Sequence, residues 1–161
     1  GLHPPVLLAG GGKASHRQPM EDLAAELGVQ DQVRFLGLCR DVPALLLKHQ
    51  IAVLSTHYEG MPLALIEGMA AGCAVVGSAV PGVREVIRDG EDGRLVPPND
   101  PAALADALHG LLTSTDEVAR LGAAARAAAL QRHSRELMSR RYEDLCCELV
   151  ANAGGARPDA A

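Results

Sequence analysis

Two glutamates in the middle of the chain have the residue type and spacing to bind a ligand. Residues 60–77 read GMPLALIEGMAAGCAVVG, where Glu67 is the only ionisable side chain apart from the Cys73 thiol. Burying an unpaired carboxylate is costly, so Glu67 needs either a hydrogen-bonding partner or a wet cleft. Glu59 lies in the loop before the same predicted helix and could line that cleft at another depth. Since carboxylates accept hydrogen bonds from adjacent hydroxyls, the pair favours recognition of a sugar or ribose over metal ligation.

Purely structural roles remain open for these and other candidate residues. Glu67 could instead cap a neighbouring loop or pair with an arginine. His57 is near Glu59, but a single histidine at a strand end is more often a loop residue than a metal ligand. No Cys-x-x-Cys is present, and the cysteines are expected to be buried, reduced thiols of a cytoplasmic protein. The cysteines are Cys39, Cys73, Cys146 and Cys147.

Two kinds of segment alternate along the chain and must position this pair: short apolar runs and segments with the periodicity of a helix. The pattern predicts strands at residues 6–9, 33–36, 51–54, 74–76 and 93–96. It predicts helices at residues 19–27, 41–47, 62–71, 81–87, 101–112, 116–130 and 134–151. Asp41 can cap the second of these helices, and Asn99 or Asp100 the fifth.

This order predicts a Rossmann-like α/β fold, with an open parallel sheet, helices on both faces and a helical C-terminal extension. Ligands of such sheets bind at the carboxyl ends of the strands. The loops after residues 9, 37, 55 and 77 are therefore expected to carry the site. Residues 1–152 are expected to form one domain, followed by a disordered tail over 153–161.

Composition excludes several classes of function. The chain has 161 residues, a net charge of −5, one Phe, two Tyr and no Trp. A nucleic-acid binder would carry a basic stripe or aromatic stacking platforms, and neither is visible. The sequence shows neither an apolar run of membrane-spanning length nor a signal peptide. We therefore expect a cytoplasmic enzyme or binding protein.

The glycine-rich run at residues 10–12 suggests two phosphate-binding motifs, and neither is complete. A dinucleotide fingerprint would need glycine where Ser15 stands. A P-loop would need glycine at Leu7, and Ser or Thr where Ala14 follows Lys13. Both alternatives are therefore weak.

Four blocks in register resemble one known family. The segment STHYEGMPLALIEGMAAG, residues 55–72, resembles the E-x7-E motif of retaining glycosyltransferases of the GT-B fold, called family 4 or group 1. Residues 33–37, residues 75–76 followed by 81–85, and residues 92–101 are similar to further blocks of that family. The resemblance covers about residues 5–145 and implies a C-terminal, donor-binding domain.

The resemblance implies a role for each site residue. Glu67 would bind the ribose hydroxyls of the donor nucleotide, and Glu59 would be the catalytic residue that contacts the transferred sugar. Backbone N–H groups would hold sugar hydroxyls or phosphate at Gly60, Met61, Pro62 and Leu63. The loop that flanks the nucleotide base would comprise Leu38, Cys39 and Arg40.

The implied reaction transfers a hexosyl group from a UDP- or GDP-sugar to an unknown acceptor with retention, without metal or other cofactor. Basic groups and helix dipoles would stabilise the leaving diphosphate. The family's basic pair and its acceptor-binding domain would precede residue 1, and Lys13 and Arg17 do not match that pair. We therefore expect an inactive C-terminal half, whose final helix, with Arg140, Arg141 and Tyr142, packs on the preceding domain.

Two further expectations concern partners. Any contact with a membrane would be peripheral and made through the preceding domain. The alternative function is a non-catalytic module, left by truncation of the enzyme, that binds a nucleotide-sugar or a protein partner without turnover.

Overall fold

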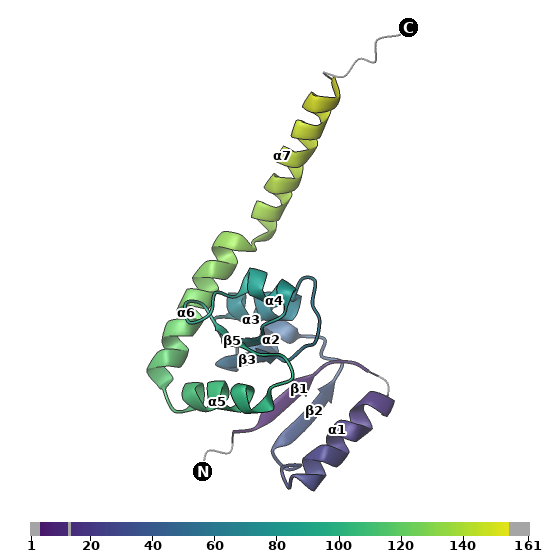
Figure 1. The fold of residues 1–161 in the computed structure, drawn as a ribbon, viewed down its shortest axis with the longest axis vertical. Coiled ribbons are helices and arrows are strands. Elements are labelled where there is room, and N and C mark those ends of the chain that lie inside the picture. The colour runs from purple at the N-terminus through teal and green to yellow at the C-terminus, as the bar shows by residue number, and fades with distance from the viewer. Residues whose placement is uncertain (1–3, 13, 155–161) are drawn as a thin grey trace. The chain divides into compact units, whose positions relative to one another are not determined.

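The computed structural model describes residues 4–12 and 14–154, and the chain forms two compact units that divide between Leu45 and Leu46 (Figure 1). The first unit contains β1 (Val6–Ala9), α1 (Ala14–Glu26) and β2 (Val33–Gly37), and α2 (Val42–Leu46) spans the division. The second unit contains β3 (Ile51–Leu54), α3 (Leu63–Ala71), β4 (Ala74–Ser78), α4 (Pro81–Val86), β5 (Arg94–Val96), α5 (Pro101–Leu112), α6 (Thr115–Arg132) and α7 (Arg135–Gly154). All the predicted strands and helices are present, with shifted ends.

The first unit is a parallel strand pair with one long helix. β1 pairs with β2 in parallel, from Val6 opposite Val33 to Ala9 opposite Gly37. α1 begins earlier than predicted and includes Pro19 in its interior. Ala24 of α1 is buried, whereas Leu23 is 53% exposed and Leu27, directly after the helix, is 65% exposed.

The second unit is built on a parallel sheet of order β3–β4–β5. The five residues of the central strand β4 are all buried, as expected for a strand covered on both faces. The predicted α/β class with parallel strands and flanking helices is confirmed. Within the described residues, hydrogen bonds group the five strands into two separate sheets, β1–β2 and β3–β4–β5, rather than one.

Two cores cover the two faces of the β3–β4–β5 sheet. Val75 lies in a cluster with apolar residues of α3, α4 and the second half of α6. Its neighbour Val76 lies in the other cluster, with Leu111 of α5 and Leu121 of α6. Consecutive strand residues point to opposite faces, which explains this alternation. α6 therefore contributes to both cores.

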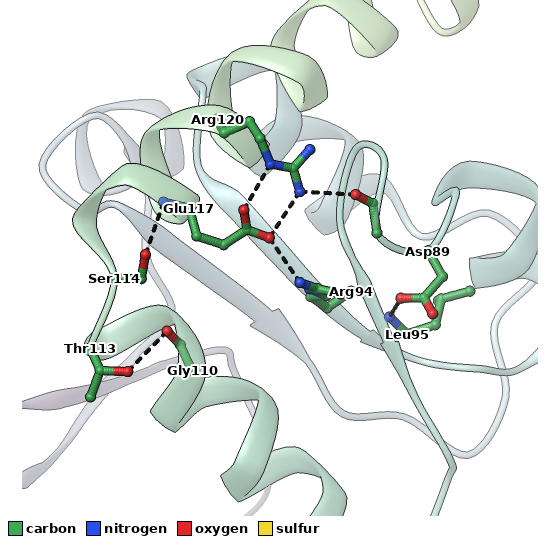
Figure 2. A network of polar contacts seen from close by, with 9 residues as sticks. Asp89, Arg94, Leu95, Gly110, Thr113, Ser114, Glu117 and Arg120 are labelled. Atoms are coloured by element: carbon green, nitrogen blue, oxygen red, sulfur yellow. Dashed lines mark hydrogen bonds and ion pairs between the residues drawn. The ribbon is translucent and has the colours of Figure 1, made fainter.

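A polar network ties the start of α6 to β5 and the turn before it. Figure 2 shows the Glu117 carboxylate between Arg94 and Arg120, and the nearest N···O distances are 2.8 and 2.7 Å. Arg120 also donates to the Gly90 carbonyl at 2.9 Å. The hydrogen bond from Arg120, followed by charge–charge attraction to both arginines, lowers the pKa of Glu117 to about 2. The carboxylate is therefore ionised throughout the physiological range.

The C-terminal extension is mostly helical, as predicted. The Asp100 carboxylate accepts from the Ala103 N–H at 2.9 Å, so Asp100 rather than Asn99 caps α5. α7 reaches Gly154, which lies inside the segment predicted to be disordered; residues 155–161 lie outside the described residues.

The prediction that the cysteines are buried is correct for only some of the four. Cys73 is fully buried, and this burial raises its pKa. Cys39 is half-buried, and Cys146 and Cys147 are exposed on α7. The prediction was wrong for the last two because helical periodicity does not reveal which helix face lacks a covering element.

Candidate functional site

The loop that carries Glu59 joins β3 to α3; we call residues 55–62 the Glu59 loop. Near its start, the Thr56 N–H donates to the Ser78 Oγ at 3.0 Å. The Thr56 hydroxyl donates to the Tyr58 carbonyl at 3.0 Å and accepts from the Tyr58 N–H at 3.3 Å. At its end, Pro62 is fully buried. The loop is therefore fixed at both ends, with Glu59 half-buried between them.

The middle of the Glu59 loop lies directly on the start of α4. A Cβ atom on Gly82 would lie 2.3 Å from the Glu59 carbonyl oxygen and 2.5 Å from that of Gly60. Both distances are far below any normal carbon–oxygen contact, so no side chain fits there. Glycine at position 82 permits this close approach of two backbones.

Glu67 lies on the solvent face of α3, not in the core. The buried face of this helix consists of Leu65, Gly68 and Met69. Within the described residues the Glu67 carboxylate is exposed and has neither a hydrogen-bond donor nor a counter-ion. The sequence offered this carboxylate either a hydrogen-bonding partner or a wet cleft, and the structure places it in solvent. A run of apolar residues hides the helix period, so the sequence did not show which face of α3 carries Glu67. The alternative role of pairing with an arginine or capping a loop is also not observed in this part of the chain.

The backbone donors at the start of α3 are fewer than the sequence suggested. Pro62 has no N–H, and the Leu63 N–H donates to the Met61 carbonyl at 2.9 Å. Among residues 4–12 and 14–154, nothing accepts from the N–H groups of Gly60, Met61 and Ala64. Sequence reasoning missed Ala64, although the second position of a helix has an unpaired N–H by construction. These donors lie at the positive end of the α3 dipole.

A pocket of about 340 Å³ lies at the carboxyl ends of β3, β4 and β5. Its lining includes Ser55, Thr56, His57, Ser78, Val96, Pro97, Asn99, Asp100, Pro101 and Leu104. The loops after residues 55 and 77 were expected here, because open parallel sheets bind ligands at this edge. Neither Glu59 nor Glu67 is among the lining residues, so the single shared cleft predicted for them is not this pocket.

The candidate base-flanking residues lie in the first unit, immediately after β2. Leu38 and Arg40 are exposed and Cys39 is half-buried, so their side chains have access to solvent. Their contact with a nucleotide base stays a prediction.

No three His, Cys, Asp or Glu side chains of residues 4–12 and 14–154 lie close enough together to hold a metal ion. In the same part of the chain, no helix combines the length and apolar character that crossing a bilayer requires.

Comparison with known proteins identifies the family. The sequence profile described as "Glycosyl transferases group 1" matches residues 2–128. D-inositol 3-phosphate glycosyltransferase of Thermomonospora curvata is 36% identical over 143 residues, which are 84% of this chain and 31% of that protein. Across three curated relatives, the matched region spans between 17% and 34% of the relative's length.

Solved structures agree with the profile match. Sucrose-phosphate synthase from Thermosynechococcus elongatus superposes with a TM-score of 0.83 at 30% identity, over 91% of this chain and 38% of that one. Anabaena HepE, solved in complex with UDP, superposes with a TM-score of 0.84 at 22% identity, over 90% of this chain and 41% of that one. This likeness supports the fold alone. The profile match covers most of the chain, and the chain therefore belongs to the group 1 glycosyl transferases.

Proposed function

We propose that this chain supplies the donor-binding half of a retaining glycosyltransferase that uses a nucleotide-sugar. The observation that carries the proposal is the Glu67 carboxylate, which is exposed and unpaired within the described residues. Glu67 is the fifth residue of α3 and lies about one turn after Leu63, the first residue of the helix. Just before Leu63, the N–H groups of Gly60 and Met61 have no acceptor among the described residues.

Glu67 binds the ribose of the donor in this proposal. A carboxylate has two oxygens that accept hydrogen bonds, and the two neighbouring hydroxyls of a ribose donate to them as a matched pair. A hydrogen bond to a charged acceptor contributes more to the binding free energy than a hydrogen bond to a neutral acceptor. Glu67 can make these bonds without breaking others, because no described residue hydrogen-bonds or ion-pairs with its carboxylate.

Glu59 acts on the transferred sugar. Its loop precedes the helix that carries Glu67, so the two carboxylates are eight positions apart in one loop–helix unit. Glu59 accepts from sugar hydroxyls and places negative charge near the anomeric carbon, where positive charge develops as the glycosidic bond to phosphate breaks.

The leaving diphosphate is stabilised by backbone donors and by the α3 dipole. The unpaired N–H groups of Gly60, Met61 and Ala64 are of the kind that binds phosphate oxygens at helix N-termini. This arrangement requires no metal ion, so we propose metal-independent transfer. Basic groups elsewhere in the whole protein would supply the remaining positive charge.

The donor is proposed to be a UDP- or GDP-sugar. HepE, a protein of the same fold, was solved in complex with UDP, and we extend this ligand class, a nucleoside diphosphate, to the present chain as part of the proposal. The matched region is a minor part of each curated relative, so transfer to an acceptor is proposed for the whole protein. The isolated chain is proposed to bind the donor without transferring sugar.

The test is a calorimetric titration of the chain with UDP, GDP and ADP. Glu67→Gln removes the charge while keeping the size, and we expect it to weaken binding by about 1.5–3 kcal/mol. Glu143→Gln is the matched control, because Glu143 is also exposed but lies on α7.

Binding of one nucleotide, weakened by Glu67→Gln and unchanged by Glu143→Gln, would support the donor site and identify the base. Equal affinity of wild type and Glu67→Gln would contradict the role of Glu67. Absence of binding for all three nucleotides would contradict the claim that this chain holds the donor without the rest of the protein.

A further inference from the structure

We propose that Ser78 and Gly82 are positioning residues that hold the Glu59 loop in its working geometry. This inference rests on the proposed role of Glu59. Both residues belong to the β4–α4 unit, Ser78 as the last residue of the strand and Gly82 as the second residue of the helix. They contact the Glu59 loop at two different points.

Ser78 fixes the start of the loop. Its hydroxyl oxygen accepts the Thr56 N–H at 3.0 Å, between residues 22 positions apart in the sequence. Ser78 is only 5% exposed, so water cannot readily replace this hydrogen bond. Because β4 is the central and fully buried strand of its sheet, the anchor itself has little freedom to move.

Thr56 transmits this anchor toward Glu59. Its hydroxyl hydrogen-bonds both the carbonyl and the N–H of Tyr58, at 3.0 and 3.3 Å. Tyr58 directly precedes Glu59 in the sequence. The backbone on the N-terminal side of Glu59 is therefore connected to the sheet through two successive side-chain hydroxyls.

Gly82 fixes the loop at Glu59 itself. The Glu59 and Gly60 carbonyl oxygens occupy the space that a Cβ on residue 82 would need, at 2.3 and 2.5 Å. α4 cannot retreat to relieve such a clash, because the neighbouring Val83 is fully buried in the core. A side chain at position 82 would therefore displace the loop rather than the helix.

The expected consequence follows from how strictly catalytic groups must be placed. Productive geometry is held to within about 0.5 Å. A misplacement of about 1 Å can lower a rate ~10²-fold. Gly82→Ala would push the Glu59 carbonyl away by several tenths of an ångström, which is the range where sugar contacts through Glu59 are lost. Glu67 lies in the helix that follows and would keep its contact with the nucleotide.

The first experiment compares the affinities of each variant for UDP and UDP-glucose, and for GDP and GDP-mannose, by calorimetry. We expect Gly82→Ala and Glu59→Gln each to weaken binding of the nucleotide-sugar about tenfold, while the affinity for the nucleotide stays within about twofold. Gly122→Ala is the matched control: its Cβ would meet the Gly72 carbonyl oxygen at the same 2.3 Å, away from the Glu59 loop. It should lower stability without changing the ratio of the two affinities.

The second experiment measures the loop directly and does not depend on ligand binding. We expect Ser78→Ala to speed amide hydrogen exchange at Thr56 about tenfold or more, and Ser78→Thr to restore protection because it keeps the hydroxyl. We also expect Gly82→Ala to shift the NMR signals of the Glu59 and Gly60 amides, and Gly122→Ala to leave them in place.

The outcomes separate this inference from the proposed function. Failure of wild type to bind any of the four ligands would count against the donor site, and the loop measurements would still decide the positioning roles. Unchanged loop signals in Gly82→Ala together with unchanged Thr56 exchange in Ser78→Ala would overturn the inference. An unaltered ratio of nucleotide-sugar to nucleotide affinity in Gly82→Ala would overturn it as well, with the donor site intact.

Discussion

Asp92 and Arg132 form an ion pair that ties the end of α6 to the turn between α4 and β5. Asp92 is 5% exposed, and its other carboxylate oxygen accepts the Arg88 N–H at 2.8 Å. Arg132 also donates to the Val86 carbonyl at 3.3 Å. One buried carboxylate thus organises the turn and anchors the long helix that covers both cores.

Removing this carboxylate should destabilise the protein strongly. Asp92→Ala leaves the Arg132 guanidinium without its counter-ion and the Arg88 N–H without its acceptor, and loss of one member of a buried pair costs about 3 kcal/mol. The free energy of unfolding in urea measures the change. Asp106→Ala, at an exposed position on α5, is the control and should stay within about 0.5 kcal/mol of wild type. A loss below ~1 kcal/mol for Asp92→Ala would mean that the pair is not an anchor.

Glu117 should give the protein a specific dependence on acid. Its pKa falls from 4.5 to about 2 in the folded state, mainly through the hydrogen bond from Arg120. A carboxyl with a lowered folded-state pKa stabilises the protein fully above its unfolded value, and this contribution is lost as the pH falls. The stability that Glu117 provides should therefore disappear between pH 4.5 and about 2.

The measurement is the free energy of unfolding of wild type and Glu117→Gln as a function of pH. The difference between the two proteins should be constant above about pH 5 and shrink as the pH falls below it. A difference that stays constant down to about pH 3 would contradict the assigned pKa. Salt should also reduce the difference, because the network lies near the surface and is screened.

Two helical glycines should respond in opposite ways to the same substitution. Gly110 of α5 has open space where a methyl group would stand, with no atom within 4 Å apart from its chain neighbours and the nearby backbone of its own helix, so Gly110→Ala should stabilise the helix by about 0.5–1 kcal/mol. At Gly122 of α6 the added carbon would meet the Gly72 carbonyl oxygen at 2.3 Å, and Gly122→Ala should cost about 1–3 kcal/mol. Thermal melts of the two variants test this; equal melting temperatures would show that α3 and α6 are not packed this closely.

Glu67→Ala should separate binding from stability. Because Glu67 is exposed and has no described partner, its removal should change the free energy of unfolding by less than about 0.5 kcal/mol. Nucleotide affinity should fall by about 1.5–3 kcal/mol, the range for a hydrogen bond to a charged group. Loss of stability without loss of affinity would assign Glu67 a structural role instead.

The fold could be predicted from the sequence because its strands are short apolar runs that end at glycine or proline. β3 and β4 were placed almost to the residue, and Asp41 caps α2 as expected, accepting from the Ala44 N–H at 3.0 Å. The start of α1 was missed because Pro19 suggested a first turn, whereas the helix accommodates it in its interior. Strand pairing into two sheets could not be predicted, since single-strand patterns carry no information on which edges meet.

The site could be predicted only in part. The E-x7-E segment identified the loop and the helix, but its apolar letters hid the solvent-facing side of α3 on which Glu67 lies. The sequence did not point to Ser78 and Gly82, because the contacts that they make are with backbone atoms of a loop about 20 residues earlier. Such contacts leave no local pattern in a sequence.

The most direct test of the donor site is to locate the bound nucleotide on the protein by NMR. In a titration of the labelled chain with the nucleotide that binds, we expect the largest amide shifts at Gly60, Met61, Ala64 and Glu67. The same residues should lose their response in Glu67→Gln. Shifts confined to Asn99, Asp100 and Leu104, which line the pocket beside β5, would contradict the assignment of the donor to the Glu59 loop and α3.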